Sequence, residues 1–144
     1  MHTFSEYLGG DHQRCDELFA VAEQAAAARD AKAADAHTRF VDAMEHHLRM
    51  EEDVLFPAFE EATGNSMGPT AVMRHEHGQM RELFGQMGEA LAVGRFDDYL
   101  GASETLLILM QQHNAKEEQM LYPMTDRMLA GRLEELLRQM RDLQ

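Results

Sequence analysis

The chain has few of the residues that cross-link or break a polypeptide: one Cys, three Pro and no Trp among 144 residues. A single Cys excludes an intrachain disulfide and is consistent with a reducing compartment. The scarcity of Pro, together with 44% apolar residues and 12 Met, favours an all-helical protein. At this length we expect one domain with a buried core.

Long apolar runs and basic charge are also lacking. No apolar run approaches the roughly 18 residues that a membrane-spanning helix needs. The first residues, MHTFSEYLGGDH, lack the basic start and apolar stretch of a signal peptide, so a cytoplasmic protein is expected. Acidic residues outnumber basic ones 26 to 13, which gives a formal charge of −13. Nucleic acid and anionic lipid are therefore not expected as partners.

What the chain does have is an internal repeat. DHQRCDELF at 11–19 returns as EHGQMRELF at 76–84, and HLRMEEDVLFP at 47–57 returns as HNAKEEQMLYP at 113–123. Each half contains a lone His followed by a His-x-x-x-Glu, and imidazole and carboxylate are ligand types for divalent metals. The repeat therefore predicts a pseudo-twofold site for two metal ions, formed by His12, His47, Glu51, His77, His113 and Glu117.

Caps and breaks predict the first two helices. Thr3 and Glu6 form a capping-box pair, so the first helix is expected to begin after Thr3 and to run to about Ala28. A turn at 29–31 precedes the second helix, which is expected to run from about Lys32 to Ala62.

The third and fourth helices follow a Gly-rich break at 64–68. Pro69 suits the first turn of the third helix, and Gly94 is expected to end it. Asp97 is expected to cap the fourth helix, which reaches about Leu129.

The expected fold is all-α. We predict an up-down-up-down four-helix bundle over residues 1–130, with a pseudo-twofold internal repeat, and a short amphipathic C-terminal helix over 131–144 in the same domain. The turns lie midway between successive His of the repeat, and residues equidistant from a turn face each other in such a bundle. The four His are therefore expected at one level, with each Glu about 6 Å along its helix from its His.

Other polar residues near these motifs have different expectations. Asp11 and Glu76 each precede a site His and are candidates to hydrogen-bond to the ligands. Glu52 and Glu118 follow the site Glu residues but are expected to point to solvent or to a neighbouring helix. The remaining His lie at the terminus or off the ligand stripe, the helix face that carries the predicted ligands, and are interpreted as solvated: His2, His37, His46 and His75.

Five further residues are assigned from the repeat. Asp16 lies one turn after His12, but its repeat counterpart is an Arg, so its part in the site stays open. Cys15 is interpreted as a buried packing thiol, and Tyr122, which corresponds to a Phe, as a core aromatic. Pro57 and Pro123 are expected to kink or end their helices.

The ligand types restrict the metal. Six nitrogen and oxygen ligands with no thiolate fit a structural zinc site poorly, and calcium prefers mostly oxygen ligands. A pair of irons bridged by Glu51 and Glu117 fits best, with manganese and zinc as substitutes. Each iron would hold two His, two carboxylate oxygens and a shared oxo or hydroxo group, with one open position.

In the order of these motifs the chain resembles the hemerythrin-like, HHE cation-binding family. The phrases that carry the resemblance are Glu51-Glu52-x-x-Leu55-Phe56-Pro57 and Glu117-Glu118-x-x-Leu121-Tyr122-Pro123. The resemblance implies a four-helix bundle with a non-haem di-iron centre, held by the six residues above, that meets O₂, nitric oxide or peroxide.

The resemblance is not to the oxygen-carrying members of that family. Those have two His on the third helix, spaced four apart, whereas this chain has Met73 four residues before His77 and Arg81 four residues after it. They also have an Asp five residues beyond the last His, where this chain has Glu117 four residues beyond it. The pattern is closer to hemerythrin-like proteins linked to oxidative or nitrosative stress and to the repair of iron–sulfur centres.

The sequence leaves several functions open. The first is a di-iron protein that binds, senses or reduces a small oxidant. The second is iron storage, donation or sensing with a partner, because the Leu/Met stripe of the C-terminal helix could dock on the bundle, on a second copy to form a homodimer, or on another protein. A bundle without metal is the third, and it predicts that apolar residues in place of Glu51 and Glu117 stabilise the fold.

Overall fold

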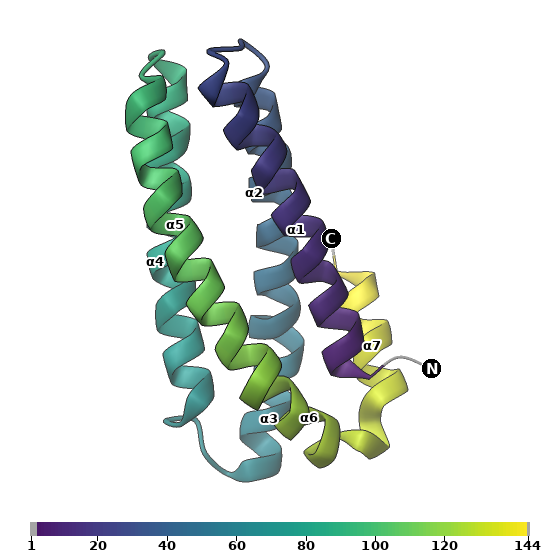
Figure 1. Ribbon diagram of the computed structural model, residues 1–144. Helices are drawn as coiled ribbons and strands as arrows, with labels where there is room; N and C mark the ends of the chain where they lie inside the picture. The colour runs from purple at the N-terminus through teal and green to yellow at the C-terminus, as the bar shows by residue number, and fades with distance from the viewer. Residues whose placement is uncertain (1–2, 144) are drawn as a thin grey trace.

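The molecule is a bundle of four helical rods with a short C-terminal helix, and the rods lie side by side in Figure 1. The computed structural model describes residues 3–143, and every regular element in that range is helical. The rods are α1 (Phe4–Ala27); α2 (Ala33–Arg49) with η1 (Met50–Leu55) and α3 (Phe56–Thr63); α4 (Pro69–Ala92); and α5 (Phe96–Lys116) with η2 (Glu117–Leu121) and α6 (Tyr122–Met128). A short turn, η3 (Ala130–Arg132), leads to α7 (Leu133–Asp142). The predicted all-α bundle with a short fifth helix is confirmed.

The rods are arranged in a closed ring. The contacts run from α1 to α2, from α2 to α4, from α4 to α5 and from α5 back to α1. The α1–α2 turn and the α4–α5 turn lie at one end of the bundle, and the α3–α4 connection lies at the other (Figure 1). Successive rods therefore alternate in direction, as expected for short connections.

Two apolar clusters lie along the axis of the bundle. One cluster, at the end nearer α7, includes Leu8, and the other, toward the α1–α2 turn, includes Cys15. Because His12 lies between these two residues on α1, the level of the predicted site falls between the clusters. The site is thus enclosed by apolar side chains on both sides.

The C-terminal helix docks on this chain's own bundle. Leu136, Leu137 and Met140 are buried in the cluster that also contains Phe4 and Leu55. The apolar stripe of α7 is therefore covered by the chain's own bundle, and not by a second copy or another protein.

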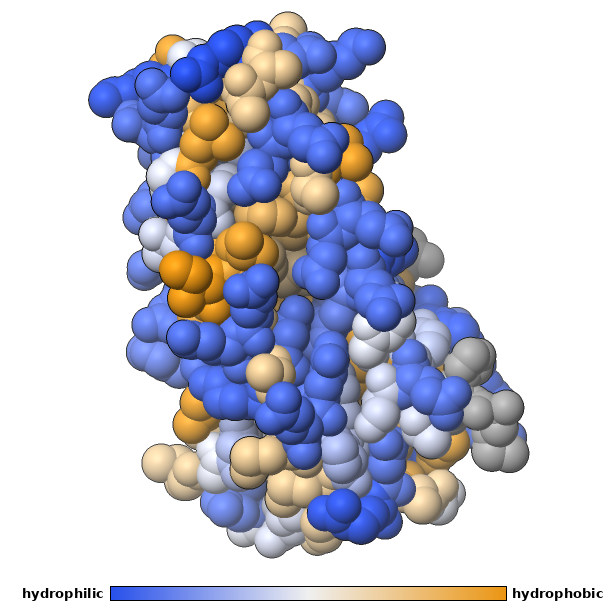
Figure 2. All heavy atoms as spheres, in the orientation of Figure 1, coloured by the Kyte–Doolittle hydropathy of each residue, from blue (hydrophilic) through white to orange (hydrophobic). Residues whose placement is uncertain are grey.

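The outer surface is largely hydrophilic on the face drawn in Figure 2, with apolar spots separated by polar side chains. The large apolar side chains that are exposed lie on several different elements: Val21, Met67, Val72, Val93, Ile108, Met120 and Met128. Among the helices described between residues 3 and 143, none is long and apolar enough to cross a membrane.

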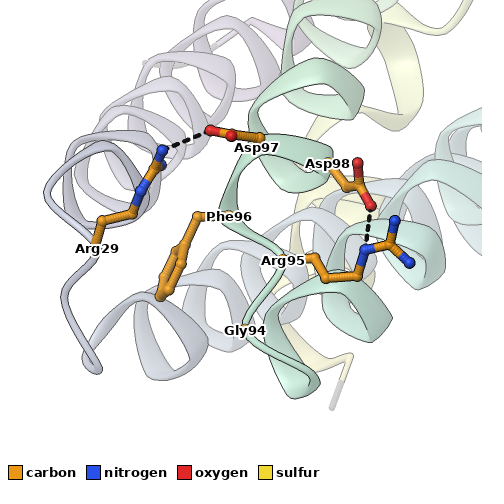
Figure 3. Close-up of a pocket in the computed structure, with 6 residues that line it drawn as sticks. All are labelled: Arg29, Gly94, Arg95, Phe96, Asp97 and Asp98. Atoms are coloured by element: carbon orange, nitrogen blue, oxygen red, sulfur yellow. Dashed lines mark hydrogen bonds and ion pairs between the residues drawn. The ribbon is translucent and has the colours of Figure 1, made fainter.

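The first helix begins as predicted, but the fourth does not. The Thr3 hydroxyl accepts a hydrogen bond from the Glu6 N–H at 3.0 Å, which confirms the capping box. Asp97 is not the cap of α5. Gly94, at φ 72°, turns the chain so that α5 begins at Phe96, and Asp97 lies in its first turn. There the carboxylate pairs with Arg29 at 2.6 Å across the end of the bundle (Figure 3).

Pro57 and Pro123 do not end their rods, contrary to that part of the expectation. Each Pro instead follows a π-helical turn, in which the N–H of Phe56 bonds to the carbonyl of Glu51 and the N–H of Tyr122 to that of Glu117. Pro has no N–H for the carbonyl four residues before it, so the narrower α-helical bond is lost there. The wider turn accommodates one extra residue between each site Glu and its Pro.

Candidate metal centre

The six side chains predicted from the repeat converge in the interior of the bundle. They come from all four rods, and the most exposed of them, His12, is only 5% exposed. Their ligand atoms form two groups of four, and within each group these atoms lie within 4.8 Å of one another. The groups are His12, His47, Glu51 and Glu117, and Glu51, His77, His113 and Glu117. Both glutamates belong to both groups, which is the arrangement that two bridging carboxylates require.

Each site histidine is oriented by a carboxylate on the adjacent rod. The Nδ1–carboxylate distances are 2.8 Å for His47–Asp11, 2.7 Å for His77–Glu52, 2.8 Å for His113–Glu76 and 2.6 Å for His12–Glu118. An ionised carboxylate only accepts hydrogen bonds, so Nδ1 carries a proton and Nε2 is the ring nitrogen that faces the centre. This arrangement is typical of metal-binding histidines.

The outer carboxylates were predicted only in part. The hydrogen bonds of Asp11 and Glu76 to site histidines are confirmed. Glu52 and Glu118 reach a neighbouring helix, which was one of their two expected directions, but their contact with a site histidine was missed. The signal was present, because both halves repeat a Glu-Glu pair at this position.

The four pairs form a closed circuit around the bundle. α1 gives a carboxylate to the histidine of α2, the second rod gives one to α4, α4 to α5, and the fourth rod to α1. Every rod therefore supplies both an acid and an imidazole. The orientation of each ring depends on the packing of the adjacent rod.

Several inward-facing atoms fit a cation. Glu51 Oε1, Glu117 Oε2 and the Nε2 atoms of His77 and His113 are buried without a hydrogen-bond partner. Although His77 Nε2 lies 3.0 Å from Glu51 Oε1, the two groups are not aligned for a hydrogen bond. A buried polar atom without a partner costs about 1–3 kcal/mol. A cation held among these atoms would remove that cost.

Without a cation, the centre holds protons instead. Burial by itself would lower the pKa of His47, but the charge of Glu51 and the hydrogen bond to Asp11 outweigh it and raise that pKa to about 10. Burial is likewise outweighed at His77, where the close carboxylate of Glu51 and the hydrogen bond to Glu52 raise the pKa to about 9. Metal binding must therefore displace protons from imidazoles that neutralise buried carboxylates.

Tyr122 is a buried core aromatic, as predicted, but it also contacts the metal-site residues, which was not predicted from the sequence. The side chain is fully buried, and its ring stacks on His12 with the centroids 5.6 Å apart. Its hydroxyl donates to Glu51 Oε2 at 2.6 Å. The repeat counterpart, Phe56, stacks on His77 at the same centroid distance of 5.6 Å. The Tyr-for-Phe difference between two otherwise matching phrases was the signal in the sequence.

His37 is buried, so its interpretation as a solvated residue is wrong. Only 5% of its surface is exposed, and its Nε2 lies 3.1 Å from the carbonyl oxygen of Phe84. The face of α2 that carries His37 packs against α4, so leaving the ligand stripe does not bring this residue to water. His75 is exposed as predicted, His46 is half-buried, and His2 lies outside the described residues.

Asp16 and Cys15 lie outside both groups of four donors. Asp16 is exposed on α1. Cys15 is buried, as predicted, and burial raises the pKa of its thiol to about 12, so the sulfur is protonated at neutral pH. A neutral thiol in an apolar cluster is a packing group.

A surface hollow of about 580 Å³ reaches the centre on one side. It is lined by Ser5, Glu6, Gly9, Gly10, His12, Gln13, Asp16 and Glu118. A side chain added at Gly9 or Gly10 would meet nothing within 4 Å. The repeat counterpart of Gly9 is Arg74, whose guanidinium covers the ring of Phe56 at 5.4 Å. The His12 side of the centre is therefore nearer to solvent than the His77 side.

Comparison with known families agrees with this geometry. A family model described as the hemerythrin HHE cation binding domain matches residues 3–125. Comparison with curated proteins and with solved structures gave no match. The matched region contains the first three rods and the fourth as far as Thr125 in α6, and the cation-binding description accords with the two buried groups of His and Glu. The chain therefore belongs to the hemerythrin HHE cation-binding family.

Proposed function

We propose that the six converging residues hold two iron ions, one between His12 and His47 and the other between His77 and His113, with Glu51 and Glu117 shared. The observation that carries this proposal is that both glutamates belong to both groups of four buried donors. Manganese or zinc would be substitutes, since the same nitrogen and oxygen ligands suit them.

We further propose that the protein binds, senses or reduces a small oxidant: O₂, nitric oxide or peroxide. Bound iron would supply redox chemistry and Lewis acidity in a site that apolar clusters enclose on both sides. The formal charge of −13 repels anionic metabolites but not these neutral molecules. The hollow beside His12 offers them an approach, because His12 itself lines it.

The chain's own groups keep the centre ready for ligands. The four outer carboxylates accept hydrogen bonds from Nδ1, so each Nε2 faces inward and offers its lone pair to a cation once any proton on it is displaced. The buried carboxylates of Glu51 and Glu117 supply two negative charges where the cations would lie. Burial excludes bulk water and strengthens these interactions.

The alternative of iron storage or donation with a partner has less support. It depended on the apolar stripe of the C-terminal helix, which is buried against the bundle. A homodimer or a protein complex through α7 would have to use the charged side of that helix.

Metal analysis tests the first part of the proposal. Protein purified without added metal, and protein reconstituted anaerobically with a ferrous salt, should each hold two irons per chain. Exchange of Glu51 and Glu117 to Leu should abolish binding, and exchange of His46 and His75 to Ala should leave it unchanged. Zinc alone, or no metal, would overturn the di-iron assignment.

Optical spectra test the second part. O₂, nitric oxide or peroxide added to the reduced, iron-loaded protein should change the visible spectrum within the mixing time for at least one of the three. Unchanged spectra with all three would overturn the proposed oxidant chemistry while leaving the metal assignment intact.

A further inference from the structure

We infer that the oxygen of Tyr122 is a seventh metal ligand, in the half of the centre that contains His12 and His47. The hydroxyl oxygen lies close to one donor atom of every side chain in that group. The distances are 2.6 Å to Glu51 Oε2, 3.0 Å to Glu117 Oε1, 3.2 Å to His12 Nε2 and 3.4 Å to His47 Nε2. The inference rests on the proposed function, because it presupposes that this group binds a cation.

The spacing is that of neighbouring ligands on one ion. Donor atoms about 2.1 Å from a metal and at right angles to each other lie about 3 Å apart. All four distances from the Tyr122 oxygen fall near this value. A phenol donates one hydrogen bond and needs no more than one or two hydrogen-bond partners to be satisfied when buried. Four metal-ligand atoms around one hydroxyl exceed what packing alone requires.

Only one half of the centre has this added oxygen. Phe56 takes the same position over His77 that Tyr122 takes over His12, with the same ring-centroid distance of 5.6 Å. The His77 half therefore has four donors from this chain and the His12 half has five. Two ions bound here would therefore not be equivalent, and the added oxygen donor would favour the more highly charged ion in the His12 half. Phenolate oxygen is an established ligand of ferric haem iron.

Ligation changes the bonding of one proton. The O–H bond of Tyr122 breaks, the oxygen keeps the electron pair and donates a lone pair to the cation, and the proton leaves to solvent. No electron transfer is part of this step.

Phenolate bound to ferric iron has a distinct optical signature. The chain is loaded anaerobically with ferrous salt, oxidised with ferricyanide and desalted. We expect a visible phenolate-to-iron charge-transfer band and, on excitation into it, resonance Raman modes of a bound tyrosinate ring. Tyr122→Phe should lose both while keeping its circular dichroism spectrum.

Matched variants assign the signal to one residue. Tyr99 is also fully buried but lies in the other apolar cluster, so Tyr99→Phe should keep the band and the ring modes. The same holds for Tyr7→Phe on α1. Persistence of the signal in Tyr122→Phe, or its absence from wild-type protein that holds two irons, would overturn this inference alone. Absence of iron from the wild-type protein would overturn the proposed function.

Discussion

The imidazole of His47 depends for its orientation on one carboxylate. Asp11 Oδ2 lies 2.8 Å from its Nδ1, and hydrogen bonds from His47 and Arg14 lower the pKa of Asp11 although burial would raise it. Such outer partners typically contribute about 10–100-fold to metal affinity.

We therefore expect Asp11→Asn to weaken metal binding by about 10–100-fold, because the amide lacks the charge that fixes the Nδ1 proton. Competition between the protein and a chromophoric chelator for Co(II) measures the change. Asp42→Asn, an exposed position on the same rod as His47, is the control and should bind as the wild type does. Equal affinities for all three proteins would contradict the role of Asp11.

His37 gives the fold a pH dependence away from the centre. Burial lowers its pKa below the ordinary 6.5, and the hydrogen bond with the Phe84 carbonyl only partly opposes this. Because the folded state disfavours the charged ring, the unfolded chain binds the proton first. The stability from neutral His37 is thus present above 6.5 and is lost as the pH falls toward the folded-state pKa.

Urea unfolding of the metal-free protein at several pH values tests this dependence. The free energy of unfolding of wild-type protein, relative to His37→Gln, should fall below pH 6.5 by at most about 1.4 kcal/mol per pH unit. His75→Gln, at an exposed histidine, should show no such difference from the wild type. A His37→Gln curve parallel to that of the wild type would contradict the prediction.

At this scale the sequence predicted the six converging residues and missed their neighbours. The repeat identified the six because it marks equivalent positions in both halves. Tyr122 was assigned from its repeat counterpart, a Phe that has no hydroxyl. Glu52 was assigned from its position around a single helix, and that position does not say what the adjacent rod presents. His37 was missed for the same reason, since the face that carries it is covered by α4.

Among the elements, the two π-helical turns are the clearest departure from regular helix. Each begins at or beside a site Glu and ends before the residue that precedes a Pro. Such turns are frequent at functional sites because one added residue rotates the side chains on either side. Here the turn separates Glu51, on the ligand stripe, from Phe56, which stacks on His77.

We expect Pro57→Ala to weaken metal binding without loss of helix. The new N–H can bond to the carbonyl four residues before it, so the rod can close as regular α-helix and turn Glu51 away from the centre. Isothermal titration with Zn(II) and far-ultraviolet circular dichroism measure the two effects. Pro69→Ala is the matched control, because an N–H in the first turn of α4 has no carbonyl of that helix to bond to. Unchanged affinity in Pro57→Ala would show that the π turn does not depend on the Pro.

The helices themselves could be predicted to within a residue or two at most ends. The capping box at Thr3 and the Gly-rich break before Pro69 have local chemistry that the sequence displays. A π turn has no such signature, since the apolar spacing before it is that of ordinary helix. Only the repeated Pro indicated that something interrupts both rods at the same place.

Over the whole molecule, the two halves of the centre differ in how firmly they are held. Arg81 binds Glu52 through both terminal nitrogens, at 2.7 and 3.0 Å, and Glu52 is 19% exposed. The equivalent carboxylate, Glu118, is 48% exposed, and Asp16 stands where the repeat would place the Arg. The hollow lies on this same side.

We expect two phases when Co(II) is withdrawn from the loaded protein by excess chelator, the faster one from the His12 half. Asp16→Arg should slow the fast phase about ten-fold by holding Glu118 as Arg81 holds Glu52. Stopped-flow absorbance follows the release. Glu17→Arg, an exposed position one residue further on with the same change of charge, should not slow it. Equal slowing by both variants would assign the effect to charge alone.

The internal repeat explains how much of the centre could be predicted from the sequence at the scale of the whole molecule. Two copies of one pattern in an alternating bundle must place their ligands at one level, so the sequence was sufficient for convergence. The side that opens to solvent depends on differences between the copies, such as Gly9 against Arg74. The effect of such a difference on solvent access depends on how the rods pack, so the sequence alone does not predict it.

The closed circuit of acids and imidazoles has a consequence for a divided chain. Asp11 hydrogen-bonds to His47, and both residues belong to the first half of the chain. Glu52, also in the first half, hydrogen-bonds to His77 of the second half, which is the repeat counterpart of His12. In a pair of fragments ending near residue 66, Glu52 of each molecule would take the place beside His12 of the other that Glu118 has in the full chain. A symmetric pair of half-length chains could therefore complete the ring, whereas one fragment by itself would leave His12 without its carboxylate.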